Sequence, residues 1–212
     1  LGEMGVSRRL IEGATGAKVL AFRSAFRRDP DFLDEGLKST GYQWDSSLTA
    51  CRTLTHFPFF LPHLRSMDLE SGILELPMSW DDENRPEGAL DFSKVLALLK
   101  KVSNNESPFV WLVHPSLAPA KKGALDRILN SLPDGMAVWP LGRTARFWAA
   151  RHATRFSHTS SKTGEVLLKI EAPVGRHDLS FELSGPISSC SRAAGALKGS
   201  PSGGKRAGVE VS

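Results

Sequence analysis

The chain has 212 residues, 41% of them hydrophobic and 24% charged, and a formal net charge of +4. This length and composition predict a soluble globular protein with one ordinary domain and a smaller appendage. No run approaches the roughly 18 consecutive apolar residues that a membrane helix needs, and no signal peptide opens the chain, so we expect no membrane span. Two cysteines, Cys51 and Cys190, exclude a disulfide framework and a cysteine-rich metal site, and unpaired thiols are favoured over one disulfide.

The first part of the sequence predicts a helix over residues 7–15 and then a strand-helix-strand unit. The apolar run 18–22 reads as a buried strand that ends at Arg23. Asp29 supplies an N-cap for the helix that follows, and Gly41 ends that helix.

The second strand of this unit, residues 42–44, ends at Asp45. In α/β folds, sites are built at the edge where the carboxyl ends of parallel strands lie. Arg23 and Asp45 lie one such unit apart, so we expect both side chains at one site. The alternative is a structural ion pair.

Residues 49–71 follow no regular period and are rich in proline and aromatic residues, so we expect a loop packed over the structure. Its histidines, His56 and His63, are seven residues apart, but Pro58 and Pro62 argue against a helix that would bring them to one face. We therefore interpret both as surface histidines or as supports of a site.

After this segment, strands and helices alternate. An apolar strand at residues 73–78 leads into a polar turn at residues 81–84, and the apolar run 109–113 ends on His114. The remaining predicted elements are helices at residues 92–101, 125–132 and 142–153 and a strand at residues 136–139. This alternation implies an α/β fold built on a mainly parallel sheet or barrel.

Beyond residue 155 the pattern changes to short alternating strands. Residues 166–171 and 178–183 predict a β-hairpin, and the chain after residue 188 has almost no apolar anchor. We therefore expect three parts, which are an α/β domain of residues 1–155, a β appendage of residues 156–188 and a disordered basic tail of residues 189–212.

Basic residues concentrate in the tail and between Arg143 and Lys162, where five basic and no acidic residues occur. Such clusters could attract an anionic polymer, and a nucleic-acid complex would then depend steeply on salt. A solvated helix face and a disordered tail explain the same charges, so we expect no nucleic-acid partner.

Three predicted strand ends bring Arg23, Asp45 and His114 to one rim of the sheet or barrel. Histidine titrates near neutral pH, which suits it to give a proton to a leaving group, and a neighbouring carboxylate fixes its tautomer. Arginine can orient a second carboxylate through a bidentate pair. The same three residues could instead make only structural contacts.

Three short phrases resemble the third, fourth and fifth motifs of the polysaccharide deacetylases, the NodB-homology group also called carbohydrate esterase family 4. They are FRSAF around Arg23, GYQWDSSL around Asp45 and LVHP around His114. Their order and approximate spacing match the family over residues 7–152, so the chain resembles the C-terminal part of that domain. The resemblance implies the later portion of a distorted (β/α) barrel and metal-dependent removal of acetyl groups from an acetylated polysaccharide such as peptidoglycan or chitin.

Carried over by position, the resemblance implies a role for each matched residue. Arg23 would orient the catalytic base, and His114 would be the general acid. Asp45 and Trp44 would support His114, and Leu112 would line the acetyl pocket.

The family's first two motifs, T-F-D-D and H-x-x-x-H, supply the base and the ligands of a zinc-like divalent metal and lie upstream of the third. The residues before Arg23 contain no histidine and no aspartate, and no two histidines stand four apart. Trp80, Asp81 and Asp82 echo the first motif, but no histidine pair follows them, so we interpret them as a polar turn. We therefore predict no metal ligands in this chain.

The chain opens on Leu1 with its first methionine at position 4, which predicts a processed or cut chain. We expect a deacetylase-like part that is inactive alone because the metal-binding half is missing, with an open sheet edge that favours self-association. The alternative function is a non-catalytic carbohydrate-binding module in which Trp44, Trp80 and the aromatic HFPFFLP segment stack on sugars. The sequence leaves the compartment open, whether cytoplasmic, periplasmic or extracellular.

Overall fold

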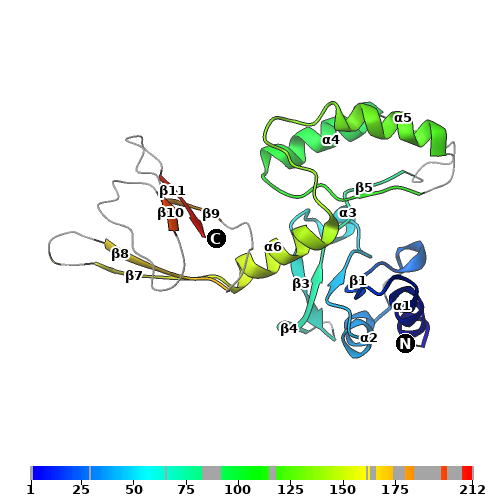
Figure 1. The fold of residues 1–212 in the computed structure, drawn as a ribbon, viewed down its shortest axis with the longest axis horizontal. Coiled ribbons are helices and arrows are strands. Elements are labelled where there is room, and N and C mark those ends of the chain that lie inside the picture. The colour runs from blue at the N-terminus through cyan, green and yellow to red at the C-terminus, as the bar shows by residue number, and fades with distance from the viewer. Residues whose placement is uncertain are drawn as a thin grey trace. The chain divides into compact units, whose positions relative to one another are not determined.

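The computed structural model describes residues 2–28, 30–64, 66–82, 92–114, 118–160, 162, 166–173, 180–183, 197–199 and 207–211. The chain divides into two compact units, residues 1–142 and residues 143–212. The first unit holds every residue that the sequence identifies as a site candidate (Figure 1).

A four-stranded sheet with flanking helices forms the first half of this unit. Its elements are α1 (Gly2–Thr15), β1 (Ala21–Phe22), the 3-10 helix η1 (Ala25–Arg27), α2 (Leu33–Thr40), β2 (Trp44–Asp45), α3 (Ala50–Thr53), β3 (Phe59–His63) and β4 (Ser66–Glu75). The strand order is β1-β2-β4-β3. Strands β1, β2 and β4 are parallel, whereas β3 runs antiparallel to β4.

Helix α2 connects β1 to β2 and buries one face against the sheet. Its apolar residues belong to a hydrophobic core cluster whose buried members are Leu33, Leu37, Tyr42, Leu61 and Ile73. Gly41 ends the helix in the left-handed region at φ 82°, as the sequence predicts. The helix begins at Leu33, later than expected, and the predicted cap Asp29 lies outside the described residues.

The prediction of a loop over residues 49–71 is wrong. Helix α3, strand β3 and the first part of β4 lie there. Strand β3 is at the edge of the sheet, and its pairing with β4 shifts register on both sides of Pro62. An edge strand tolerates proline because one side of its backbone needs no partner, and the register shifts explain why no regular period marks this strand in the sequence.

Beyond β4 the chain stays extended and changes its neighbour. The N–H of Leu76 donates to the carbonyl of Asp45 at 2.8 Å, which continues the pairing with β2. The N–H of Ser79 then donates to the carbonyl of Val110 at 2.8 Å, and β5 (Trp80–Asp81) pairs in parallel with β6 (Trp111–Leu112). One extended segment therefore joins both sets of parallel strands.

Helices α4 (Phe92–Asn104) and α5 (Ala118–Leu129) follow β5 and β6 in the chain, and α4 confirms the amphipathic helix predicted there. Its buried Val95 and Leu99 form a second core cluster with Ile128 of α5. One turn prediction and one strand prediction fail here. Asp81 belongs to β5 and not to a polar turn, and residues 136–139 pair with no described strand. A run of four apolar residues predicts burial, but a strand also needs a partner.

The second unit begins within α6 (Leu141–Ala153), which confirms the predicted helix. Strand β7 (Arg155–Ser160) pairs antiparallel with β8 (Val166–Glu171), so β8 does not form the predicted hairpin with the strand that follows it. The other strands, β9 (Ser180–Leu183), β10 (Leu197–Gly199) and β11 (Ala207–Val211), form a sheet of order β10-β11-β9. Strands β10 and β11 lie within the tail that the sequence predicts to be disordered, so the structure differs from the prediction there. The rest of the tail lies outside the described residues.

The described residues form a mixed α/β structure, as predicted, in which short sheets remain separate and no barrel closes. Among the helices that the structure describes, none combines the length and the hydrophobicity that crossing a membrane requires.

Candidate functional site

Polar side chains gather at the carboxyl ends of the parallel strands in the first unit. Arg23 directly follows β1, Asp45 ends β2 and Glu75 ends β4. The strand register pairs Phe22 with Asp45 and Asp45 with Glu75. The sequence therefore predicted correctly that Arg23 and Asp45 lie at one edge, and it missed Glu75. The sequence could have identified Glu75, because it is the one charged residue in the apolar run of residues 73–78.

The guanidinium of Arg23 is held by Ser46. Its Nε donates to the Ser46 carbonyl at 2.8 Å, and its Nη2 donates to Ser46 Oγ at 2.6 Å. Burial lowers the pKa of Arg23, while attraction to Glu75, Asp45 and Asp81 opposes that shift. Arg23 thus provides a fixed positive charge among three carboxyl groups on different strands.

Asp45 and Glu75 form a buried carboxyl pair. Ser47 Oγ donates to Asp45 Oδ1 at 2.7 Å, and the N–H of Leu48 donates to Glu75 Oε1 at 3.1 Å. The other two oxygens, Asp45 Oδ2 and Glu75 Oε2, are buried and accept no hydrogen bond from any other residue in the described part of the chain. Burial and the charge of Asp45 raise the pKa of Glu75 to about 10. A proton on Glu75 that is donated to Asp45 therefore satisfies both oxygens.

His114 and Asp82 form a second polar pair, after β6 and β5. His114 Nδ1 donates to Asp82 Oδ1 at 2.6 Å, and the backbone N–H of His114 donates to Asp82 Oδ2 at 3.0 Å. Asp81 Oδ1 lies 3.6 Å from the same Nδ1. The side chains of Asp81 and Asp82 are nearly inaccessible, whereas 34% of the His114 side chain is exposed. The carboxylate thus fixes the tautomer of a histidine that solvent can reach.

The partner of His114 differs from the one that the resemblance implies. Asp45 bonds to Ser47 and Glu75, and Asp82 holds His114 instead. Trp44 is buried at 9% exposure, so the expectation that it stacks on a sugar does not fit its position. Leu112 is half-buried in β6, two residues before His114. The cluster of Arg23, Asp45 and Glu75 interacts with the pair of His114 and Asp82 through electrostatic attraction between Arg23 and Asp81, the neighbour of Asp82.

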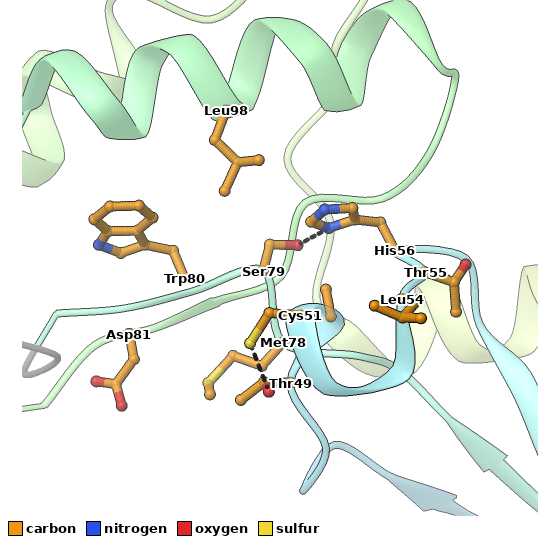
Figure 2. Close-up of a pocket in the computed structure, with 11 residues that line it drawn as sticks. Thr49, Cys51, Leu54, Thr55, His56, Met78, Ser79, Trp80, Asp81 and Leu98 are labelled. Carbon is orange, nitrogen blue, oxygen red and sulfur yellow. Dashed lines mark hydrogen bonds between the residues drawn. The ribbon is translucent and has the colours of Figure 1, made fainter.

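A pocket of about 480 Å³ adjoins this site. Its walls come from α3 and the residues around it, the segment from Met78 to Asp81, and Leu98 of α4 (Figure 2). The apolar lining residues are Ala50, Leu54, Met78, Trp80 and Leu98, and the polar ones are Thr49, Cys51, Thr55, His56, Ser79 and Asp81. This volume is within the range that small-ligand sites occupy. Asp81 lines the pocket and lies beside His114, so the pocket and the polar pair share a wall.

The sequence missed the contribution of His56 to this pocket. His56 Nδ1 lies 2.9 Å from Ser79 Oγ, and both residues line the pocket. The other histidine of the segment, His63, bonds to Asp34 Oδ2 at 3.0 Å and is not among the pocket residues. No sequence signal separates the two, because their roles depend on which distant residue each one meets, Ser79 for His56 and Asp34 for His63.

Asp81, Asp82 and His114 could hold a metal ion by donor type. Each offers one oxygen or nitrogen, and these atoms lie within 4.8 Å of one another. His114 Nδ1 and Asp82 Oδ1 are joined by a 2.6 Å hydrogen bond, so a metal ion that used these two atoms would have to break it. Cys51 is a free, exposed cysteine, and Cys190 lies outside the described residues.

Comparison of the chain with protein-family models, with curated proteins and with solved structures gave no match. The activity of the chain therefore has to be inferred from its own residues.

Proposed function

We propose that this chain is a polysaccharide deacetylase-like hydrolase part, which supplies the acid histidine and the arginine-carboxyl cluster of a site that removes acetyl groups from an acetylated glycan. The observation that carries the proposal is the arrangement at the strand ends. His114, after β6, is hydrogen-bonded to Asp82 at 2.6 Å. Arg23 and Asp45 lie together at the carboxyl ends of β1 and β2. This order of strand-end residues agrees with the three motifs that resemble the deacetylases. In that family the site belongs to a (β/α) barrel, and the barrel remains part of the proposal.

The chemistry requires a proton donor at the leaving group. In amide hydrolysis, water adds to the acetyl carbon, the carbon-nitrogen bond breaks, and the departing amine takes a proton while acetate is released. His114 is suited to give that proton, because Asp82 accepts the hydrogen of Nδ1 and leaves Nε2 as the nitrogen that carries the transferred proton. Asp82 replaces Asp45 in the supporting role. Arg23 supplies a positive charge that acts on Glu75, Asp45 and Asp81.

The family implies a divalent metal, and the described residues fit it poorly. In the Asp81, Asp82 and His114 group, His114 Nδ1 and Asp82 Oδ1 are already bonded to each other, and the sequence contains no H-x-x-x-H pair. We therefore propose no metal-bound step of the hydrolysis at these residues. The base and the metal ligands of the complete site would come from motifs that this sequence lacks, so the 212 residues alone should release no acetate.

Ligand binding tests the proposal without requiring turnover. We expect N,N′,N″-triacetylchitotriose to bind the chain, as followed by NMR or calorimetry, and the His114→Ala variant to bind it more weakly. His63→Ala is the matched control, because His63 also bonds to an aspartate, but its partner is Asp34 of α2 and not the Asp82 that holds His114. Affinity that is unchanged in His114→Ala would contradict the catalytic assignment.

The second candidate, a non-catalytic carbohydrate-binding module, is favoured by one observation. Trp80 lines the pocket together with polar residues, an arrangement that suits stacking on a sugar ring. In that case Trp80→Ala would abolish glycan binding, while His114→Ala would leave it intact. Loss of glycan binding in both Trp80→Ala and His114→Ala favours the hydrolase.

A further inference from the structure

His56 and Ser79 form a hydrogen-bonded pair in the wall of the pocket. His56 comes from the segment between α3 and β3, and Ser79 directly precedes β5. Figure 2 shows the imidazole ring beside the Ser79 hydroxyl, with a dashed line from Nδ1 to Oγ, which lie 2.9 Å apart. The function proposed above assigns no role to this pair.

The surroundings of Ser79 determine the direction of this hydrogen bond. Ser79 Oγ accepts a hydrogen bond from the backbone N–H of Val110 at 3.1 Å. In the described part of the chain, the Ser79 hydroxyl has no acceptor for its own hydrogen other than His56 Nδ1. The hydroxyl therefore donates to Nδ1, because the opposite direction would leave its hydrogen without a partner among the described residues.

The proton of the neutral ring must then be on Nε2. Burial lowers the pKa of His56, so the ring is neutral at pH 7. Among the described residues, Nε2 has no hydrogen-bond partner. A half-buried ring in a pocket wall thus carries an N–H donor that a ligand can satisfy.

The other walls restrict the kind of acceptor that can enter. The nearly inaccessible carboxyl group of Asp81 disfavours anionic ligands such as carboxylates and phosphates. Trp80, Met78 and Leu98 offer apolar surface to a sugar ring or a methyl group. An amide carbonyl carrying a methyl group combines an uncharged acceptor with an apolar end.

We propose that His56 is a substrate-binding residue, whose Nε2–H donates a hydrogen bond to the acetamido carbonyl oxygen of an N-acetylated sugar. This inference rests on the function proposed above and narrows its substrate to N-acetyl sugars. His56 then distinguishes an acetylated residue from its deacetylated product, because the ammonium group of the product offers no acceptor.

Imidazole nitrogen NMR on ¹⁵N-histidine-labelled protein tests the tautomer without any ligand. We expect the His56 ring to be neutral with its proton on Nε2, and loss of one set of signals in His56→Gln assigns the residue. A ring protonated on Nδ1 would overturn the inference.

Binding of N,N′,N″-triacetylchitotriose tests the contact. His56→Phe keeps a ring and removes the donor, so affinity should fall about tenfold, as for one lost hydrogen bond. His56→Gln offers an amide N–H and should retain most of the affinity. His63→Phe is the control and should bind like the wild type, and circular dichroism verifies that each variant is folded.

The outcomes separate this inference from the proposed function. Affinity that falls in His114→Ala but not in His56→Phe overturns the role of His56 and leaves the hydrolase proposal standing. Affinity that falls in His56→Phe but not in His114→Ala supports His56 and contradicts the catalytic role of His114. Absence of binding by the wild type contradicts both.

Discussion

Asp45 and Glu75 are register partners on neighbouring parallel strands, and both carboxyl groups are buried. Two ionised carboxylates in this position would repel each other without solvent to screen them. A shared proton removes that repulsion and converts the contact into a hydrogen bond. The pair therefore makes the stability of the sheet depend on pH.

Glu75→Gln should change this pH dependence. The carboxyl group of Glu75 has an ordinary pKa of 4.5 in the unfolded chain and about 10 in the folded chain. Unfolding therefore releases a proton between these values, so the wild type loses stability as pH rises. Glutamine has no such proton. The free energy of unfolding of the variant should therefore rise relative to that of the wild type as pH increases from about 5 to 9. Urea unfolding across this range measures the effect.

The exposed Glu35→Gln is the control for that experiment, because Glu35 lies on the outer face of α2. Its stability should follow the pH profile of the wild type. Parallel profiles for Glu75→Gln and the wild type would show that Glu75 is ionised in the folded chain.

Arg23→Ala should destabilise the first unit by about 2–4 kcal/mol, because it removes two hydrogen bonds to Ser46 and the cation that offsets buried carboxyl groups. Arg23→Lys should recover only part of the loss, since an ammonium group cannot reproduce the two directed N–H donors. The exposed Lys100→Ala should change the free energy of unfolding by less than about 0.5 kcal/mol. A loss in Arg23→Ala as small as that of the control would mean that Ser46 and the carboxyl pair do not depend on the guanidinium.

Zinc titration should show no stoichiometric tight binding by this chain. His114 Nδ1 and Asp82 Oδ1 are bonded to each other, and a closed zinc site needs about four ligands. Calorimetry with zinc chloride measures the binding. Tight binding that Asp82→Asn abolishes would instead make Asp81, Asp82 and His114 a metal centre.

Gly41→Ala should destabilise the contact between α1 and α2 by about 1–3 kcal/mol. Gly41 has φ 82°, which an alanine adopts only with strain, and a Cβ there would meet the guanidinium of Arg8. Arg8 also bonds to the Thr40 carbonyl and to Glu12, so its displacement loosens α1. Thermal unfolding measures the change.

The matched substitution is Gly13→Ala within α1, where a Cβ would meet no neighbour. It should stabilise the helix by about 0.5–1 kcal/mol, because alanine favours helix more than glycine does. Equal effects at both positions would show that the left-handed conformation of Gly41 is not required.

Local patterns in the sequence predicted the early part of the fold well. The i,i+4 leucines of α2, the stop at Gly41 and the strand ends at Arg23 and Asp45 all depend on short stretches of chain, and the structure confirms them. The strands within residues 49–71 were missed because β3 is an irregular edge strand, and Pro62 within it interrupts the pattern expected of a paired strand. The tail strands β10 and β11 were missed because both are short and are surrounded by residues rich in serine, glycine and lysine.

The sequence by itself located Arg23, Asp45 and His114 at or just after strand ends, because a strand end depends on local hydrophobicity and turn residues. Only the tertiary structure decided how these residues pair. Asp82 and not Asp45 holds His114, Glu75 is the partner of Asp45, and Ser79 orients His56. Each of these contacts joins residues that are more than 20 positions apart. Their distances are set by strand register and by the switch of the extended segment from β2 to β6, which no local pattern records.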